Sequence, residues 1–157
     1  MMNLFTVLLF FHSLIRWFVL AGLLIAICRA YRGYTKRLPF DKTDNALRHW
    51  TATVAHIQLM LGIYMYTQSP TVKSLFNGIA STNRVSEPVF FGAIHIGMML
   101  AAIIIITIGS ARARRQLNHH DKFKTMLIWF GIALAAIFIA IPWPFSPLAH
   151  RPYLRSF

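Results

Sequence analysis

Acidic residues are scarce in this chain, which has four Asp and Glu against 16 Lys and Arg among its 157 residues. Charged residues make up only 13% of the sequence, whereas soluble domains carry about 25%. Hydrophobic residues reach 57%, and the mean hydropathy is +0.55. This composition excludes an ordinary water-soluble domain. It also excludes a disordered arm that binds nucleic acid, because such an arm combines high charge with few apolar residues.

Cysteine is almost absent as well. Cys28 is the one cysteine of the sequence, so neither an internal disulfide nor a thiolate metal cluster can form within this chain. No Ser/Gly-rich linker, low-complexity tract or internal repeat divides the sequence. We therefore expect a single domain over residues 1–157.

The sequence contains four long apolar runs. Each run can cross about 30 Å of hydrocarbon, which takes about 20 helical residues. Pro142 and Pro144 terminate the last run. The pattern predicts an all-α membrane protein, a four-transmembrane-helix up-down bundle with spans at about Leu4–Ile27, Ala46–Tyr66, Pro88–Ile108 and Phe123–Ile141.

The basic residues fall mainly on one side of these predicted spans. Eleven lie in the two segments that join spans one to two and three to four, and they are Arg29, Arg32, Lys36, Arg37, Lys42, Arg48, Arg112, Arg114, Arg115, Lys122 and Lys124. The opposite side has four, which are Lys73, Arg84, Arg151 and Arg155. The positive-inside rule then places the basic loops of this multi-pass protein in the cytoplasm and both termini outside.

Three histidines lie at one depth within the predicted spans. His12, His56 and His95 come from three different spans and fall within about one helical turn of each other in depth. Ionisable groups inside a bilayer are costly and commonly mark a functional site. We expect a shared ligand for these rings, although each alone is explained by a structural hydrogen bond. Three neutral imidazoles can hold copper or zinc, and two can hold a haem iron from both sides.

The expected helix order favours haem over a copper or zinc site. In an antiparallel bundle the first and third spans are diagonal, and a diagonal pair supplies the wide separation that a porphyrin requires. His12 and His95 are therefore the predicted axial ligands. His56 then contacts a haem edge or a quinone, or it replaces one of the two ligands if the helix order differs.

Arg16 lies four residues after His12 and so on the same helix face. All four acids of the chain are predicted in loops or at span ends, so we expect the anion for Arg16 to come from elsewhere, with haem propionates as a fitting partner. The alternatives are backbone carbonyls at a helix break, a water-filled cavity or an acid of a partner subunit. Gln58 is a further polar group at this level, which either binds the cofactor or hydrogen-bonds between helices.

A second polar group is expected at the basic side. His49 begins the second span, and Asn118-His119-His120-Asp121 precedes the fourth. A second haem or a quinone pocket between His49 and His120 is geometrically allowed, but solvated loop histidines are the preferred interpretation.

The chain also resembles a known family, and its motifs span nearly the whole sequence. These are His12-Ser13-x-x-Arg16-Trp17, His56-Ile57-Gln58-Leu59, Ser69-Pro70, His95, Lys122-Phe123-Lys124-Thr125 and Ile141-Pro142-Trp143-Pro144-Phe145. In these it resembles the small bacterial four-helix membrane proteins described as cytochrome b-like. The resemblance implies haem b binding, electron transfer and a location in the bacterial inner membrane. The chain departs from the family pattern at Ile94, the residue directly before His95. Members of the family often have an acid at this position.

These observations predict a membrane cytochrome that passes electrons between a quinone pool and a redox partner, as a quinone-linked oxidoreductase or an electron-transfer subunit. Expected partners are membrane lipid, quinone, and other redox subunits or a second copy of the chain. The competing hypotheses are a haem-free accessory subunit of a larger membrane complex and a copper or zinc site built by His12, His56 and His95.

Overall fold

The computed structural model describes residues 4–78, 86–146, 149 and 151–153. Arg84 and Arg155, two basic residues of the predicted outer side, lie outside these ranges. The helices are α1 (Leu4–Thr35), α2 (Lys42–Gln68), α3 (Pro70–Phe76), α4 (Glu87–Val89), η1 (Phe90–His95), α5 (Ile96–Arg115) and α6 (His119–Ala140). The η1 segment is a π-helical turn, and α4, η1 and α5 form one continuous helix over residues 87–115.

The prediction of a four-transmembrane-helix bundle is wrong. Among the described residues there are five helices when 87–115 is counted as one, and three of the five are long and apolar enough to cross a membrane. These three are α1, the 87–115 helix and α6. The prediction that both termini lie outside depended on four crossings, and three candidate spans do not support it. Three such helices are compatible with a multi-pass membrane protein.

The polar residues of α2 explain why three helices, and not the predicted four, are candidate spans. This helix has 27 residues, enough to cross a bilayer, and it contains the whole of the predicted second span. Its apolar run is interrupted near the middle by Thr51, Thr53, His56 and Gln58. These four side chains keep α2 out of the group of candidate spans.

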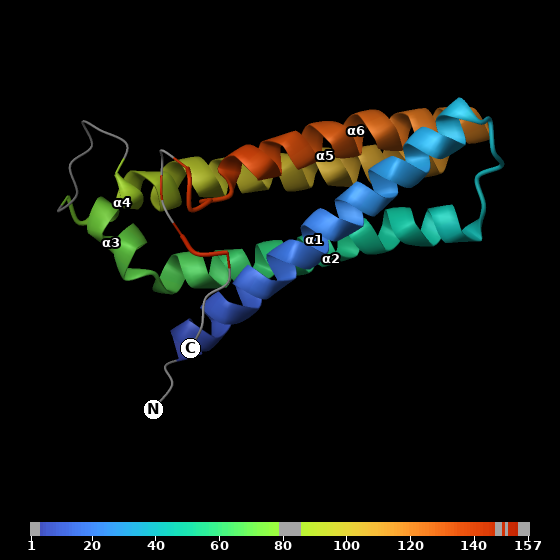
Figure 1. Cartoon of the computed structure of the whole chain (residues 1–157). Coiled ribbons are helices and arrows are strands. Elements are labelled where there is room, and N and C mark those ends of the chain that lie inside the picture. Colours follow the sequence, from blue (N-terminus) through green and yellow to red (C-terminus); the bar gives the residue numbers. More distant parts are fainter. Residues whose placement is uncertain (1–3, 79–85, 147–148, 150, 154–157) are drawn as a thin grey trace.

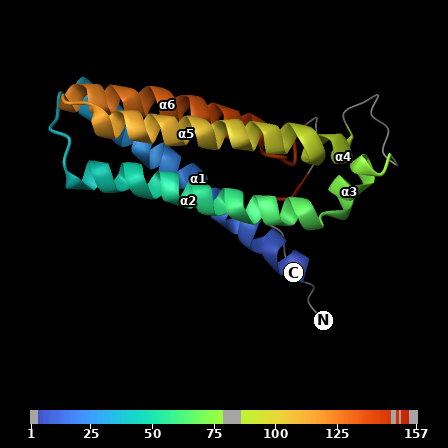
Figure 2. The same ribbon diagram turned by 180° about the vertical axis from the view of Figure 1, so that it is seen from behind.

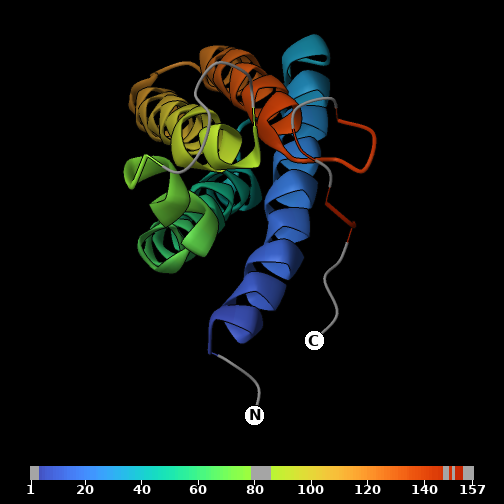
Figure 3. The same cartoon turned by 90° about the vertical axis from the view of Figure 1, so that its left-hand side faces the viewer.

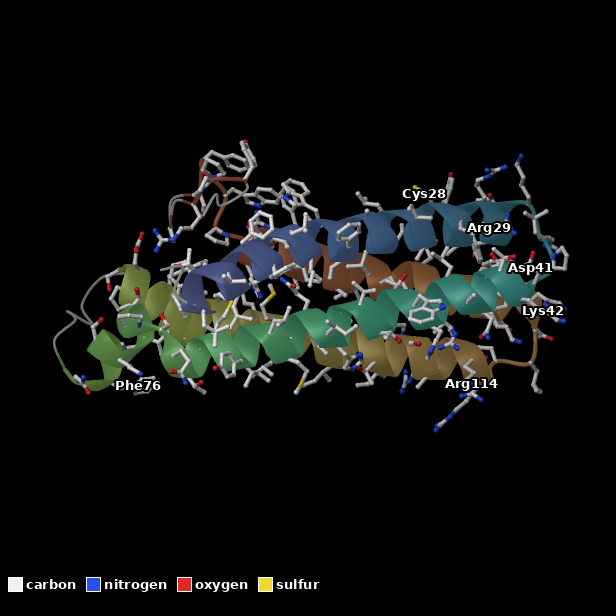
Figure 4. The ribbon with its side chains drawn as sticks, turned by 90° about the horizontal axis from the view of Figure 1, so that it is seen from below. Cys28, Arg29, Asp41, Lys42, Phe76 and Arg114 are labelled. Carbon is white, nitrogen blue, oxygen red and sulfur yellow. The ribbon has the colours of Figure 1, made fainter. Side chains whose placement is uncertain are left out.

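The four long helices lie side by side with alternating direction (Figures 1 and 2). Helix α1 packs against α2 and α6, and α5 packs against the same two helices, so α1 and α5 lie across from each other. Figure 3 shows that α1 is inclined to the other three. The end of α1, the start of α2, the end of α5 and the start of α6 meet at one end of the molecule, which we call the basic end (Figure 4).

Small residues bring the helices close at the basic end. Gly33 of α1 lies against Phe123 of α6, and a Cβ atom at position 33 would overlap the Phe123 ring. Gly109 of α5 lies against Trp129 of α6 in the same way. Phe123 is fully buried as a result. Close packing of this kind stabilises helix pairs in membranes, where apolar burial alone supplies little driving force.

A network of three side chains closes the turn between α1 and α2. Asp41 is the N-cap of α2, and it forms a capping box in which the Asp44 amide donates to Asp41 Oδ1 at 2.8 Å. The Asp44 carboxylate is 1% exposed and accepts from Arg29 Nε at 2.6 Å. The cap thus fixes the start of α2 and ties it to α1.

The capping box predicts a loss of stability in acid. Hydrogen bonding from the Asp44 backbone amide and the charge of Arg29 hold the pKa of Asp41 below its ordinary value of 3.8. A carboxyl group with a depressed folded-state pKa stabilises the fold above its ordinary pKa, and that contribution is lost as pH falls through the folded-state pKa. We expect thermal unfolding in detergent to show a drop in stability below about pH 4 that is smaller in Asp41→Asn.

Asp121→Asn is the control for this experiment, because it removes a different carboxylate from the basic end. Equal acid profiles for Asp41→Asn and the unchanged protein would contradict the assignment of the drop to the capping box.

Candidate functional site

A cavity of about 230 Å³ lies between α1, α2 and the 87–115 helix in the half of the molecule away from the basic end. Four of the five residues predicted for the site line it, and they are His12, Arg16, Gln58 and His95. The first two come from one face of α1, as their spacing of four residues requires. Gly62, Tyr66 and Arg151 are further polar or small residues of the lining.

The π-helical turn presents His95 to the cavity. Its Nδ1 atom lies 2.8 Å from the backbone oxygen of Ala140, the last residue of α6. A carbonyl oxygen only accepts hydrogen bonds, so Nδ1 carries the ring proton and Nε2 keeps its lone pair. His95 is therefore held in the tautomer and orientation that suit a metal ligand at Nε2.

The prolines after α6 explain why Ala140 is free to accept this bond. The amides that would bond to Phe138 and Ala140 in a continuing helix belong to residues 142 and 144, and both are proline, which has no N–H. Trp143 Nε1 donates to the Phe138 oxygen at 2.8 Å, and His95 takes the Ala140 oxygen. The Pro-Trp-Pro sequence thus supplies the acceptor that orients His95.

His12 faces the cavity from α1 and packs against Gly62 of α2. A Cβ atom at position 62 would lie 3.3 Å from His12 Cε1, so the absent side chain makes room for the ring. Gln58 Nε2 donates to the His12 backbone oxygen at 2.9 Å. Two buried polar atoms at this contact, His12 Nδ1 and Gln58 Oε1, have no hydrogen-bond partner among the described residues.

Arg16 hydrogen-bonds to a backbone oxygen. Its Nη2 atom donates to the Tyr153 oxygen at 2.6 Å, and Trp17 Nε1 donates to the same oxygen at 3.1 Å. The Nε atom of Arg16 is buried and has no partner among the described residues. One alternative had been backbone carbonyls at a helix break, whereas Tyr153 lies in the segment after α6. The guanidinium still has a buried donor without an acceptor among the described residues.

The acids of the chain are all engaged elsewhere. Asp41 and Asp44 interact with Arg29. Glu87 accepts from Arg151 Nη2 at 2.6 Å beside the cavity. Asp121 lies near Asn118 and His120 at the basic end. Among the described residues, none of these contacts of the four carboxylates involves Arg16.

His56 is not part of this cavity. Its side chain is exposed, its Nδ1 lies 2.7 Å from the Ala52 oxygen, and its Nε2 lies 3.1 Å from Thr107 Oγ1. The described part of the chain contains no group of three or more His, Cys, Asp or Glu side chains suited to a metal ion. The structure therefore brings His12 and His95 to one cavity and leaves His56 on another surface.

The two histidines considered for a second cofactor also have separate surroundings. His120 stacks on Tyr34 with ring centroids 4.2 Å apart. His49 lies beside Trp50 and lines a groove between α2 and α5. The structure does not place them around a common pocket.

Several residues of the site were missed by sequence reasoning. Tyr66 donates its hydroxyl to the Gly92 oxygen at 2.9 Å and thereby braces the π-helical turn. Arg151 and Tyr153 belong to the segment after α6, downstream of the Ile141–Phe145 motif, and neither was predicted to reach the cavity. The signal that could have led to this segment is the pair of prolines, because they leave two carbonyl groups that other side chains must satisfy.

Comparisons with protein-family models, with curated proteins and with solved structures find no match for this chain. The function is therefore inferred from the geometry of the cavity.

The contact between Gly62 and His12 predicts different effects of two Gly→Ala changes. A Cβ atom at Gly97 meets no atom within 4 Å, so Gly97→Ala should stabilise α5 by about 0.5–1 kcal/mol through helix propensity. At Gly62 the same gain is opposed by contact with the His12 ring. We expect Gly62→Ala to be less stable than Gly97→Ala in detergent unfolding; equal stabilisation by both would contradict the close His12–Gly62 contact.

Proposed function

We propose that this chain is a membrane electron-transfer protein that holds haem b in the cavity between α1, α2 and the 87–115 helix. The observation that carries the proposal is a pair of imidazoles, His12 and His95, that face one cavity from helices lying across from each other. Helices that cross a membrane rarely place two histidines toward one apolar cavity without a ligand. Haem, when bound, supplies a reversible one-electron couple.

His12 and His95 are the residues that would hold the iron. The bond from His95 Nδ1 to the Ala140 oxygen leaves Nε2 available as a ligand atom. The same arrangement, a ring nitrogen tied to a carbonyl while the other binds metal, fixes histidine ligands in many proteins. His12 has a buried Nδ1 without a partner among the described residues, so its ring is not committed to a structural hydrogen bond there.

Arg16 and Gln58 would hydrogen-bond to polar groups of a bound ligand. Arg16 Nε is a buried donor, which suits a carboxylate such as a haem propionate. Gln58 Oε1 is a buried acceptor held in place by the bond from its Nε2 to the His12 oxygen. It suits a donor group on a ligand, such as the hydroxyl of a reduced quinone.

The orientation and partners of the proposal follow from charge and solubility. The basic residues at the joined ends of α1, α2, α5 and α6 favour a cytoplasmic position for that end in a bacterial inner membrane. The cavity then lies toward the opposite face of the membrane. A quinone pool dissolved in the bilayer is the electron carrier nearest to such a cavity, with a redox subunit or a second copy of the chain as the other partner.

Absorption spectra of the detergent-purified protein test the ligand assignment. We expect reduced-minus-oxidised spectra with sharp low-spin bands, and loss of these bands in His12→Ala and in His95→Ala. His56→Ala is the matched control, because it removes a histidine that lies outside the cavity, and it should keep the bands.

Two outcomes would reject the proposal. Bands that survive both cavity substitutions would show that other groups hold the pigment. A colourless protein would favour a haem-free accessory subunit. Because a cavity variant can lose pigment by unfolding, helix content by circular dichroism is recorded for each variant, and added imidazole should restore bands to a folded His12→Gly protein.

Arg16 provides a second test, through the reduction potential. A positive charge near the iron disfavours the oxidised, more positive state, so its removal in Arg16→Gln should lower the potential by on the order of 50 mV. Arg16→Lys retains the charge and should shift the potential much less. Equal potentials for Arg16→Gln and the unchanged protein would remove the proposed role of Arg16.

A further inference from the structure

A second hollow lies between α2 and α5 at the basic end, with a volume of about 540 Å³. We call it the basic groove, and its lining includes Arg48, His49, His56, Thr107, Arg114 and Arg115. It shares no lining residue with the cavity described above. Three guanidinium groups and two imidazoles from two helices therefore surround one space.

Arg48 is the buried member of this set. Its side chain is 6% exposed. Nη1 donates to the backbone oxygen of Ser110 at 3.1 Å and to the Ser110 hydroxyl, and Nη2 donates to Asn45 Oδ1 at 2.9 Å. These acceptors are neutral, so they satisfy hydrogen bonds of Arg48 without balancing its charge.

The other two arginines increase the positive charge. Arg114 and Arg115 are exposed residues of the last turn of α5, and Arg114 lies near enough to Arg48 for the two charges to repel each other. Figure 4 shows Arg114 on the same end of the molecule as Arg29 and Asp41. The four acids of the sequence have the partners given above, at Arg29, Arg151 and His120. The charge of the basic groove is thus not matched by a carboxylate of this chain.

The helix surfaces next to the basic groove are apolar and exposed. On α2, Met60 and Ile63 follow His56 by four and seven residues, and on α5, Ile104 precedes Thr107 by three, so they continue the faces that line the groove. Met60 is 67% exposed and Ile104 is 57% exposed. An anionic group in the groove would therefore continue directly into an apolar strip that runs toward the middle of the membrane.

We propose that the basic groove binds the phosphate headgroup of an anionic phospholipid, whose acyl chains lie along Met60, Ile63 and Ile104. The ligand is an amphiphile and not free phosphate, because the cationic groove and the apolar strip adjoin on the same two helices. The basic groove also lies at a depth that suits a lipid headgroup. The candidate span 87–115 ends at the groove, and its last turn carries Arg114 and Arg115. Basic pockets between membrane helices recognise acidic headgroups in this way.

Lipid titration of the detergent-purified full chain, followed by native mass spectrometry, tests the proposal. Phosphatidylglycerol should bind at least about tenfold more tightly than phosphatidylcholine. Each arginine near an anionic headgroup contributes about fivefold to binding, so Arg114→Gln with Arg115→Gln should weaken phosphatidylglycerol binding by about 30-fold. Arg114→Lys with Arg115→Lys keeps both charges and should restore most of the affinity.

The matched control is Arg32→Gln with Lys124→Gln, which removes two exposed charges from the same end but outside the groove. An equal loss of binding in this control would overturn the proposal in favour of general attraction to the basic end. Inorganic phosphate is titrated alone and as a competitor. Displacement of the lipid by phosphate at comparable concentration would overturn the assignment to an amphiphile.

Discussion

The structure depends on one constraint, which is that a polar group buried away from water must find a hydrogen-bond partner. With four acids in the chain, carboxylates cannot serve most of its cations and imidazoles. Backbone carbonyl groups take their place. His95 uses the oxygen of Ala140, Arg16 uses that of Tyr153, and Arg48 uses that of Ser110. Two of these three acceptors lie at or beyond the end of α6, where no further helical turn claims them.

The exceptions to this constraint lie together. Four buried side-chain atoms lack a partner among the described residues, and three of them belong to residues lining the main cavity, namely His12, Arg16 and Gln58. The fourth is Ser86 Oγ at the start of α4. A donor, an acceptor and an imidazole left unsatisfied around one space are the groups that a ligand with both charged and neutral polar atoms would satisfy. Their concentration at one place separates this cavity from the packed interior between α5 and α6.

Sequence reasoning located the long helices but did not predict toward which space each polar side chain points. The apolar runs located the long helices, and the spacing of four residues correctly put His12 and Arg16 on one face. A helix turns by about 100° per residue, so His56 and Gln58, two residues apart, must point to nearly opposite sides. Equal depth was therefore no evidence that both reach one cavity. The π-helical turn that presents His95 leaves no pattern in the residues, and the bond to Ala140 depends on how α5 packs against α6.

The polarity of α2 follows from its position between two hollows. Gln58 and Gly62 face the cavity, whereas Arg48, His49, Thr53 and His56 face the basic groove. The polar residues that keep α2 out of the candidate spans are thus largely the residues that line the two spaces. A helix that only filled the space between α1 and α5 would gain from apolar residues at these positions. Polar groups at membrane depth commonly mark functional surfaces, and those of α2 line both hollows to which a ligand is assigned by proposal.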